Sequence, residues 1–173
     1  MLLLTMYFLN LQINWDERYV DDEGNDCLVS VDCTDCKVGV KFNKSWFSYK
    51  FKKAGVRYEI ALCIKTGHIV WINGPYPCGD YNDLTIFRLA LIHELDENER
   101  VECDDGYLGE APEFCKVPKT QRFYDTKEKL IISQRARSRQ ETVNKRLKQF
   151  NCLKGTFRHD VEYHQTFFLL LLY

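Results

Sequence analysis

The chain has 173 residues, of which 45% are hydrophobic and 14% aromatic; this is enough for one folded domain with a sizeable core and excludes a disordered chain. The net charge of −1 does not indicate a partner, although the charge is unevenly distributed. Both ends are apolar, but neither reaches the roughly 20 residues of a membrane-spanning helix, so we expect no membrane association.

Eight cysteines would permit a disulfide framework in a secreted protein, but Cys27, Cys63 and Cys103 lie within predicted strands, where cysteine is usually a small buried hydrophobe. The pair Cys33-x-x-Cys36 is half of a zinc motif and has no second pair of ligands at a suitable spacing. The pattern favours reduced thiols in an intracellular compartment.

The first clear element is an apolar run that leads into carboxylates. Residues 27–31 are typical of a buried strand, and Asp32 and Asp35 follow them. A lone Asp is most often a turn residue, whereas a carboxylate at the end of an interior strand is costly unless it is paired or binds a metal. The second interpretation gains weight because the arrangement recurs further along the chain.

Two β-rich runs, residues 56–65 and 68–73, flank a Thr66-Gly67 turn signal and predict a β-hairpin. Together with the strand of Asp32 they would form a three-stranded antiparallel meander. Just before the hairpin, Trp46, Phe47 and Tyr49 lie among lysines. They could stack on an unpaired base, but packing in the hairpin core is the interpretation that we favour.

The second half of the chain predicts two helices and one strand. A helix over residues 83–95, capped by Asp80 or Asn82, has an apolar stripe at three- to four-residue spacing. A short strand over residues 101–103 ends in Asp104 and Asp105, and residues 106–125 read as irregular. A long helix over residues 127–150 has eight basic and two acidic residues up to residue 148; its expected buried edge is Val143, Leu147 and Phe150.

The order of these elements is typical of an RNase H-like fold. In this α/β architecture an antiparallel three-stranded meander is followed by a crossover helix and a fourth strand beside the first, in a mixed sheet flanked by helices. Asp32 and Asp104 would meet where neighbouring strands end, and a late helix would bring Glu141 to the same edge. Three converging acids are therefore expected.

Carboxylates without sulfur or imidazole partners suit hard cations such as Mg²⁺ or Mn²⁺. Two such ions about 4 Å apart support in-line phosphoryl displacement. One activates the attacking water or 3′-hydroxyl, and the other stabilises the leaving 3′-oxygen. We therefore expect two divalent ions and phosphodiester chemistry.

Four stretches carry a family resemblance: Val31-Asp32-Cys33-Thr34-Asp35, Gly74-Pro75-Tyr76-Pro77-Cys78-Gly79-Asp80-Tyr81-Asn82-Asp83, Cys103-Asp104-Asp105-Gly106-Tyr107 and Arg137-x-x-x-Glu141-x-x-x-x-x-Leu147-Lys148-x-Phe150. In this order and spacing they resemble the motifs of DDE-superfamily transposase endonucleases. The closest likeness is to the Harbinger-type eukaryotic group and its bacterial insertion-sequence relatives. The resemblance covers about residues 26–165; each motif alone is weak, and their succession is what makes it specific.

The resemblance implies that Asp32, Asp104 and Glu141 are the catalytic DDE triad, and that these three together with Asp83 hold the metal ions. For Asp83 the alternative is a helix N-terminal acid that favours the helix dipole. For Glu141 it is an ion pair with a basic residue four positions away, which the family spacing disfavours. The adjacent acids Asp35 and Asp105 are expected to support the site or to face solvent.

The basic helix is expected to contact DNA phosphates, which adds salt-dependent affinity without sequence information. The alternative is a solvated helix face. The residues assigned to DNA binding are Arg135, Arg137, Arg139, Lys145 and Arg146.

Full-length family members have a separate N-terminal DNA-binding domain and often act with a companion protein. This chain begins shortly before its first motif, so we expect an N-terminally truncated transposase: residues 1–25 as a remnant, 26–165 as the catalytic domain and 166–173 as an apolar tail. The apolar ends are either elements cut off from something larger or core segments of a terminal strand or helix.

The leading hypothesis is a metal-dependent DNA endonuclease and strand-transfer enzyme, a hydrolase that acts as a homo-oligomer. Its expected location is the nucleus, with the cytoplasm as the alternative. The alternative function is that of a domesticated or decayed protein that binds DNA or a partner without catalysis. A third hypothesis is a genomic fragment without selected function.

Overall fold

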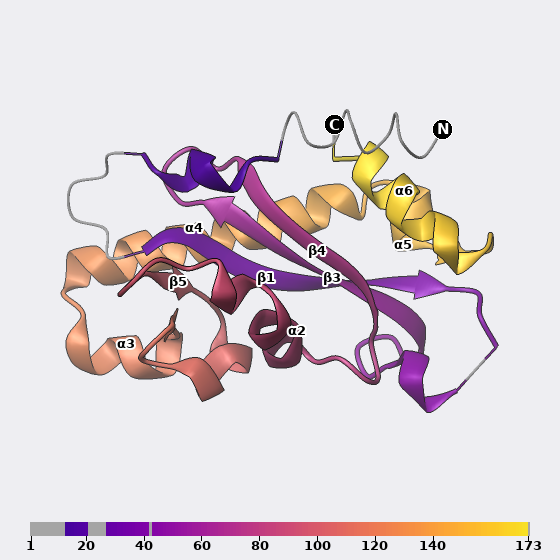
Figure 1. The fold of residues 1–173 in the computed structure, drawn as a ribbon, viewed down its shortest axis with the longest axis horizontal. Helices are drawn as coiled ribbons and strands as arrows, with labels where there is room; N and C mark the ends of the chain where they lie inside the picture. The colour runs from indigo at the N-terminus through magenta and orange to yellow at the C-terminus, as the bar shows by residue number, and fades with distance from the viewer. Residues whose placement is uncertain (1–12, 21–26, 42, 173) are drawn as a thin grey trace.

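The computed structural model describes residues 13–20, 27–41 and 43–172, apart from the side chains of residues 122 and 124. Its centre is a mixed β-sheet, in which β1, β3 and β4 lie side by side as long strands (Figure 1). The strands are β1 (Cys27–Val38), β2 (Phe47–Ser48), β3 (Lys53–Cys63), β4 (Ile69–Pro77), β5 (Arg100–Glu102), β6 (Cys115–Lys116) and β7 (Thr156–Phe157).

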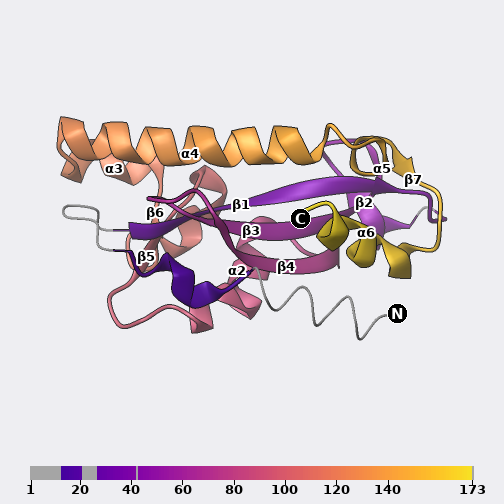
Figure 2. The same ribbon diagram turned by 90° about the horizontal axis from the view of Figure 1, so that it is seen from above.

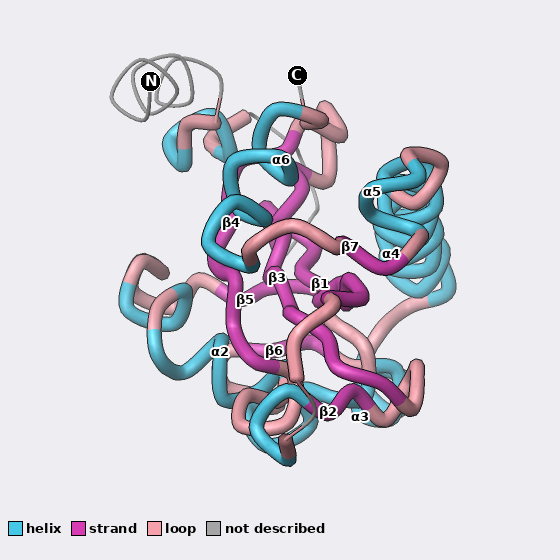
Figure 3. The backbone as a smooth tube through the Cα atoms, turned by 90° about the vertical axis from the view of Figure 1, so that its right-hand side faces the viewer, coloured by secondary structure: helices cyan, strands magenta, loops and turns pink. Residues whose placement is uncertain are grey.

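Helices flank this sheet on both faces. In Figure 2 the long helix α4 runs along one face of the strands, and α2 lies on the other. Figure 3, a view from one end, again has α4 and α5 on one side and α2 on the other. The helices are α2 (Asp83–Leu89), α3 (Pro118–Tyr124), α4 (Lys127–Leu147), α5 (Asn151–Lys154) and α6 (His164–Leu170), with 3-10 turns η1 (Trp15–Arg18), η2 (Lys44–Trp46), η3 (Leu91–His93), η4 (Asp105–Glu110) and η5 (Val161–Tyr163).

The pairing of the strands gives a mixed α/β protein, as expected. Strand β3 pairs antiparallel with both β1 and β4, which confirms the predicted hairpin and meander. On the other side of β1, β5 is parallel, and β6 is parallel to β5. The short β2 pairs with the start of β3, and β7 runs parallel to the end of β1. The sheet is therefore antiparallel on one side of β1 and parallel on the other.

Two apolar layers hold the sheet between the helices. On the α2 side, Val29 and Val31 pack with Phe87 and Leu91. On the opposite side, Tyr58 and neighbouring β3 residues pack with Leu147 of α4 and with α6. Because β-strand side chains alternate between faces, the even-numbered residues Ser30 and Asp32 point toward α4.

The C-terminal apolar segment is a core element within the described residues. The ring of Phe168 on α6 stacks on Tyr58, with the ring centroids 3.8 Å apart, and is fully buried. This end therefore contributes to the core as a helix, one of the forms expected for it. Most of the predicted remnant, residues 1–25, lies outside the described residues. Only residues 13–20 of it are described.

Three predictions about elements were wrong in detail. Helix α2 ends at Leu89, and the apolar stripe continues through the 3-10 turn η3 rather than through a helix to residue 95. Residues 106–125 contain η4, β6 and α3 rather than irregular structure. Helix α4 ends at Leu147 rather than at residue 150, so the expected edge residue Phe150 lies beyond it and is exposed, whereas Ser133 and Gln140 of α4 are buried.

All eight cysteines are free thiols, and seven of them are buried. Within the described part of the chain, no helix is long and apolar enough to cross a membrane.

Candidate acidic site beside β1

Asp32 lies in the middle of β1 and not at its end, because β1 stays paired with β3 as far as Lys37. On its other edge β1 is paired with β5 only at Cys27 and Ser30, and with β7 only from Lys37 onward. Asp32 falls in the interval where no strand of the described residues pairs with this edge. The gap left by the short β5 thus gives the carboxylate partial access to solvent within an otherwise buried strand.

Asp104 reaches the same place through the register of the parallel strands. Ser30 of β1 is opposite Glu102 of β5, so Asp104, two residues beyond, lies beside Asp32. There Asp104 is the N-cap of η4: its Oδ1 accepts a 2.8 Å hydrogen bond from the amide of Gly106. A Cβ at position 106 would lie only 2.8 Å from this oxygen, so glycine permits the close turn.

The three acids of the predicted triad line one small cavity. Its volume is about 110 Å³, and it lies between the β1–β5 edge and the face of α4. The residues around it are Ser30, Val31, Asp32, Asp104, Arg137, Gln140 and Glu141.

Glu141 lies on the rim of this cavity. Its side chain is 71% exposed, and its Oε2 is 3.9 Å from Nζ of Lys145, one helical turn away. This is the ion pair named as its alternative role, and at such exposure it contributes little to stability. The α4 residues that contact β1 are instead Gln140, which precedes Glu141, and Asn144, three positions after it.

Asn144 and Gln140 make those contacts. The Asn144 side-chain amide donates a 2.7 Å hydrogen bond to Oδ2 of Asp32, while the Asn144 Oδ1 is buried without a hydrogen-bond partner. Gln140 accepts from Ser30 Oγ and donates to the Ile60 carbonyl. Our reading of the sequence missed both amides. Gln140 and Asn144 are four positions apart and so lie on the same face of α4, but no charge or apolar pattern in the sequence marks this face.

Asp83 occupies the first turn of α2 and is held by an arginine. Its Oδ1 is 2.8 Å from Nη1 of Arg57, which also binds Asp35 through two nitrogens at 2.7 and 3.0 Å. Asp35 is buried, and Ser48 Oγ donates to it at 2.7 Å. The expectation that Asp35 supports the site fits this position, and the solvent-facing alternative does not. Asp105 is less buried and accepts from the Lys119 amide at 3.1 Å.

The electrostatic environment of Asp32 is distinct from that of Asp35. Burial raises the pKa of Asp32 to about 7, helped by the negative charges of Asp104 and then Asp83, against a hydrogen bond from the Cys33 amide. For Asp35 burial also favours the neutral form, but hydrogen bonds from Arg57 and Ser48 bring its pKa below the usual value. Asp35 is thus paired with a cationic side chain, whereas Asp32 accepts hydrogen bonds but has no ion pair among the described residues.

An uncompensated carboxylate beside a second one is suited to a cation. The oxygens of Asp32 and Asp104 are hard donors, and Asn144, whose amide nitrogen binds Asp32, adds a neutral Oδ1 that has no hydrogen-bond partner among the described residues. Across the described residues, however, no group of three or more His, Cys, Asp or Glu side chains is close enough together to hold a metal ion. The chemistry of the donors at Asp32 and Asp104 suits a hard cation, while Glu141, the third acid at the cavity, is exposed and paired with Lys145.

The basic residues of α4 lie in different surroundings. Arg137, which lines the cavity, donates to the buried Glu102 at 3.1 Å and to Gln121 at 2.9 Å. Arg139 donates to the Ile64 carbonyl, and Lys145 pairs with Glu141. Arg135 and Arg146 are exposed on the outer surface of the helix.

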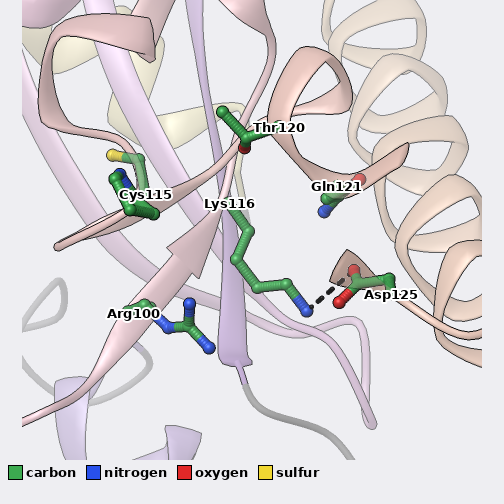
Figure 4. Close-up of a pocket in the computed structure, with 7 residues that line it drawn as sticks. Arg100, Cys115, Lys116, Thr120, Gln121 and Asp125 are labelled. Carbon is green, nitrogen blue, oxygen red and sulfur yellow. Dashed lines mark ion pairs between the residues drawn. The ribbon is translucent and has the colours of Figure 1, made fainter. Parts of the chain in front are cut away.

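A larger cavity, about 320 Å³, lies beside β6 and α3 (Figure 4). Its charged lining residues are Arg100, Lys116 and Asp125; Lys116 Nζ is 3.2 Å from Asp125 Oδ2, the ion pair drawn dashed in the figure. Lys116 is also 3.8 Å from buried Glu102. None of the four predicted acids lines this cavity, so its size does not make it the candidate site.

Comparison of the chain with protein-family models, with curated proteins and with solved structures found no match. The resemblance to transposases therefore rests on the four sequence motifs.

Proposed function

We propose that the protein is a metal-dependent DNA endonuclease domain of transposase type. The observation that carries the proposal is the single cavity lined by Asp32, Asp104 and Glu141. These residues are separated by 72 and 37 positions in the chain, and each belongs to a different one of the four sequence motifs. A chance resemblance gives no reason for all three to border one cavity of about 110 Å³.

The arrangement of the strands supports an RNase H-like fold. The order β4–β3–β1–β5–β6 has an antiparallel meander followed by two parallel strands, with α2 on one face and α4 on the other. The predicted meander and the fourth strand beside β1 are part of this order, and in an RNase H-like fold the three acids would have their family positions.

In this proposal Asp32 and Asp104 are the main ligands of Mg²⁺ or Mn²⁺, and Glu141 completes the site by a change of side-chain rotamer. Asp83 is a weaker candidate because Arg57 already neutralises it. When bound, two such ions would activate a water or 3′-hydroxyl and stabilise the leaving 3′-oxygen. Hydrolysis transfers the water oxygen to phosphorus and breaks its bond to the 3′-oxygen, so the products are a 3′-hydroxyl and a 5′-phosphate.

The chain's own residues would orient this site. The Asn144 amide and the Cys33 N–H fix the two oxygens of Asp32, each at 2.7 Å. Beside Asp32, hydrogen bonds of Gln140 link α4 to β1 and β3. Arg57 holds Asp83 and Asp35 together beneath the site. The substrate would be DNA, contacted by Arg135 and Arg146 on α4; a companion DNA-binding protein, a homo-oligomer and a nuclear location complete the proposal.

One observation favours the second candidate, a domesticated or decayed protein that binds DNA or a partner without catalysis. Glu141 is exposed and paired with Lys145, and the described residues contain no preassembled group of three metal-binding side chains. If Glu141 cannot turn inward, the cavity retains two acids and no catalytic triad.

Nicking of supercoiled plasmid DNA in Mg²⁺ or Mn²⁺ tests the proposal. We expect nicking by the wild-type chain and a loss of at least about 100-fold in Asp32→Asn, Asp104→Asn and Glu141→Gln, since each removes a carboxylate that the two ions require. Glu128→Gln, at the other end of α4, is the matched control and should retain full activity. Equal nicking by all four variants would overturn the assignment, and loss in the first two alone would remove Glu141 from it.

A further inference from the structure

The turn between β2 and β3, residues 49–52, presents an aromatic ring to solvent and is itself firmly held. The residue that precedes it, Ser48, is fully buried, donates to Asp35 and accepts from the Lys52 amide at 2.8 Å. Lys52 has a φ of 57°, a left-handed conformation that closes the turn. These interactions therefore hold the turn in one conformation, in which it projects into solvent.

Tyr49 is the exposed ring. Its side chain is 76% exposed, and within the turn region it meets Phe47 edge to face with the centroids 5.1 Å apart. Lys52 Nζ lies 5.6 Å from the centre of the ring. The sequence favoured packing of Trp46, Phe47 and Tyr49 in the hairpin core. Trp46 and Phe47 are half-buried, but Tyr49 is not part of the core. A large ring left this exposed gains little from folding, so its contribution to stability is small.

Four lysines from three elements surround the turn. Lys37 of β1 and Lys148 after α4 lie 5.1 and 5.8 Å from the centre of the Phe51 ring. Lys50 and Lys52 belong to the turn itself. None of the four forms an ion pair with an acid in the described part of the chain. Their charges repel one another: burial, and after it the charge of Lys50, lowers the pKa of Lys148.

This surface adjoins the acidic site. Lys148 follows Asn144 by four residues on the same helical face, and Asn144 binds Asp32. Lys50 is near enough to oppose the rise in the pKa of Asp32 that burial produces. Lys50 and Lys148 of this surface thus lie near Asp32, whereas Arg137 and Arg139 are engaged with protein groups.

We propose that the Tyr49–Lys52 turn, with Lys37 and Lys148, binds an unpaired DNA strand and leads it to the cavity of Asp32 and Asp104. The lysines would neutralise phosphates, and Tyr49 would stack on a base. Stacking on an exposed ring requires a base that is not enclosed in a duplex, so the chemical class is single-stranded DNA or a duplex end with unpaired nucleotides. The identification of the ligand as DNA rests on the proposed function, whereas the presence of the cationic and aromatic surface is independent of it.

Binding of a fluorescent oligothymidylate of about 12 nucleotides, followed by anisotropy in EDTA, tests this surface without bound metal. Tyr49→Ala should weaken binding about tenfold and leave its salt dependence unchanged, because it removes stacking and no charge. Tyr49→Phe should bind like wild type. Lys50→Gln combined with Lys148→Gln should reduce the slope of log affinity against log salt by about 1.4, because two phosphate contacts are lost.

Matched controls distinguish this surface from charge or exposed aromatic area in general. Phe123→Ala removes a ring that is 80% exposed on α3, and Lys65→Gln removes an exposed lysine beyond the other end of β3; both should bind like wild type. No binding by the wild-type chain, wild-type affinity in Tyr49→Ala, or tighter binding of a blunt duplex would each overturn the proposal. Tyr49-dependent binding in a chain that neither binds Mn²⁺ nor nicks DNA would sustain it while the catalytic proposal failed.

Discussion

At the scale of single residues, Glu59 shows how strongly burial acts on an acid in this sheet. Its side chain is fully buried; the Trp71 indole donates to Oε2 at 3.1 Å, and Oε1 has no hydrogen-bond partner. Burial raises the pKa of Glu59 to about 8, and the charge of Asp83 adds to the effect. Glu59 is therefore mostly protonated at neutral pH, unlike Asp35, which has Arg57.

A pH-dependent loss of stability follows. The folded pKa of Glu59 lies above its unfolded value, so the stability that protonation provides is complete below about pH 4.5 and is lost as the pH rises through about 8. Glu59→Gln keeps an acceptor for Trp71 and cannot ionise. Urea unfolding should find the variant more stable than wild type by about 4–5 kcal/mol at pH 9 and within about 1 kcal/mol of it near pH 5. Parallel pH profiles of the two proteins would contradict this assignment.

Glu59 also marks a limit of sequence reasoning at this scale. The acids Asp32 and Asp104 could be identified because each follows an apolar run within a recognisable motif. Glu59 lies in an alternating run at a position where alternation predicts a solvated face, but α2 and η4 cover that face. Asn144 was missed for a related reason: an amide has no charge pattern, and its importance depends on how α4 crosses β1.

At the scale of elements, Arg57 joins three parts of the fold. It extends from β3 and binds Asp35 of β1, Asp83 of α2 and the Tyr81 carbonyl before that helix. Only 15% of its side chain is exposed, so the two carboxylates depend on it for charge compensation. The pairing fixes the start of α2 against the sheet beneath the acidic site.

Removal of this arginine should be far more harmful than removal of a surface one. Arg57→Met leaves two largely buried carboxylates without a cation and should lower the free energy of unfolding by about 3–5 kcal/mol at pH 7. Arg88→Met, which breaks a pair between a half-exposed arginine of α2 and Glu110, should lower it by less than about 1 kcal/mol. Similar losses of unfolding free energy in the two variants, measured by urea unfolding, would show that Asp35 and Asp83 do not depend on Arg57 for charge compensation.

The elements that could be predicted are those with long periodic patterns. The meander and the helix beginning at Lys127 follow from alternation, turn residues and helical spacing. The short elements η4, β6 and α3 have no such periodicity and form where the chain packs against β5 and α2. Pro118 at the first turn of α3 is a helix-start signal that our reading passed over in favour of irregular structure.

At the scale of the whole molecule, the mixed sheet explains the location of the site. Strand β5 stops at Glu102, and β7 joins β1 only at Lys37, so the edge of β1 at Asp32 is left without a neighbouring strand. Helix α4 covers this interval from one face. The fold thus creates a small cavity between strand edge and helix, lined by Asp32 and Asp104, which form no ion pair with the described residues.

The measurement that tests the central claim most directly is Mn²⁺ binding by calorimetry to the wild-type chain, Asp104→Asn and Asp105→Asn. Asparagine can replace Asp104 as the cap of η4, so the first variant should fold, and Asp105→Asn is its matched control at the adjacent position. We predict saturable binding by wild type and by Asp105→Asn, and none by Asp104→Asn. No binding by a folded wild-type chain, or equal binding by all three, would contradict a carboxylate metal site at Asp32 and Asp104.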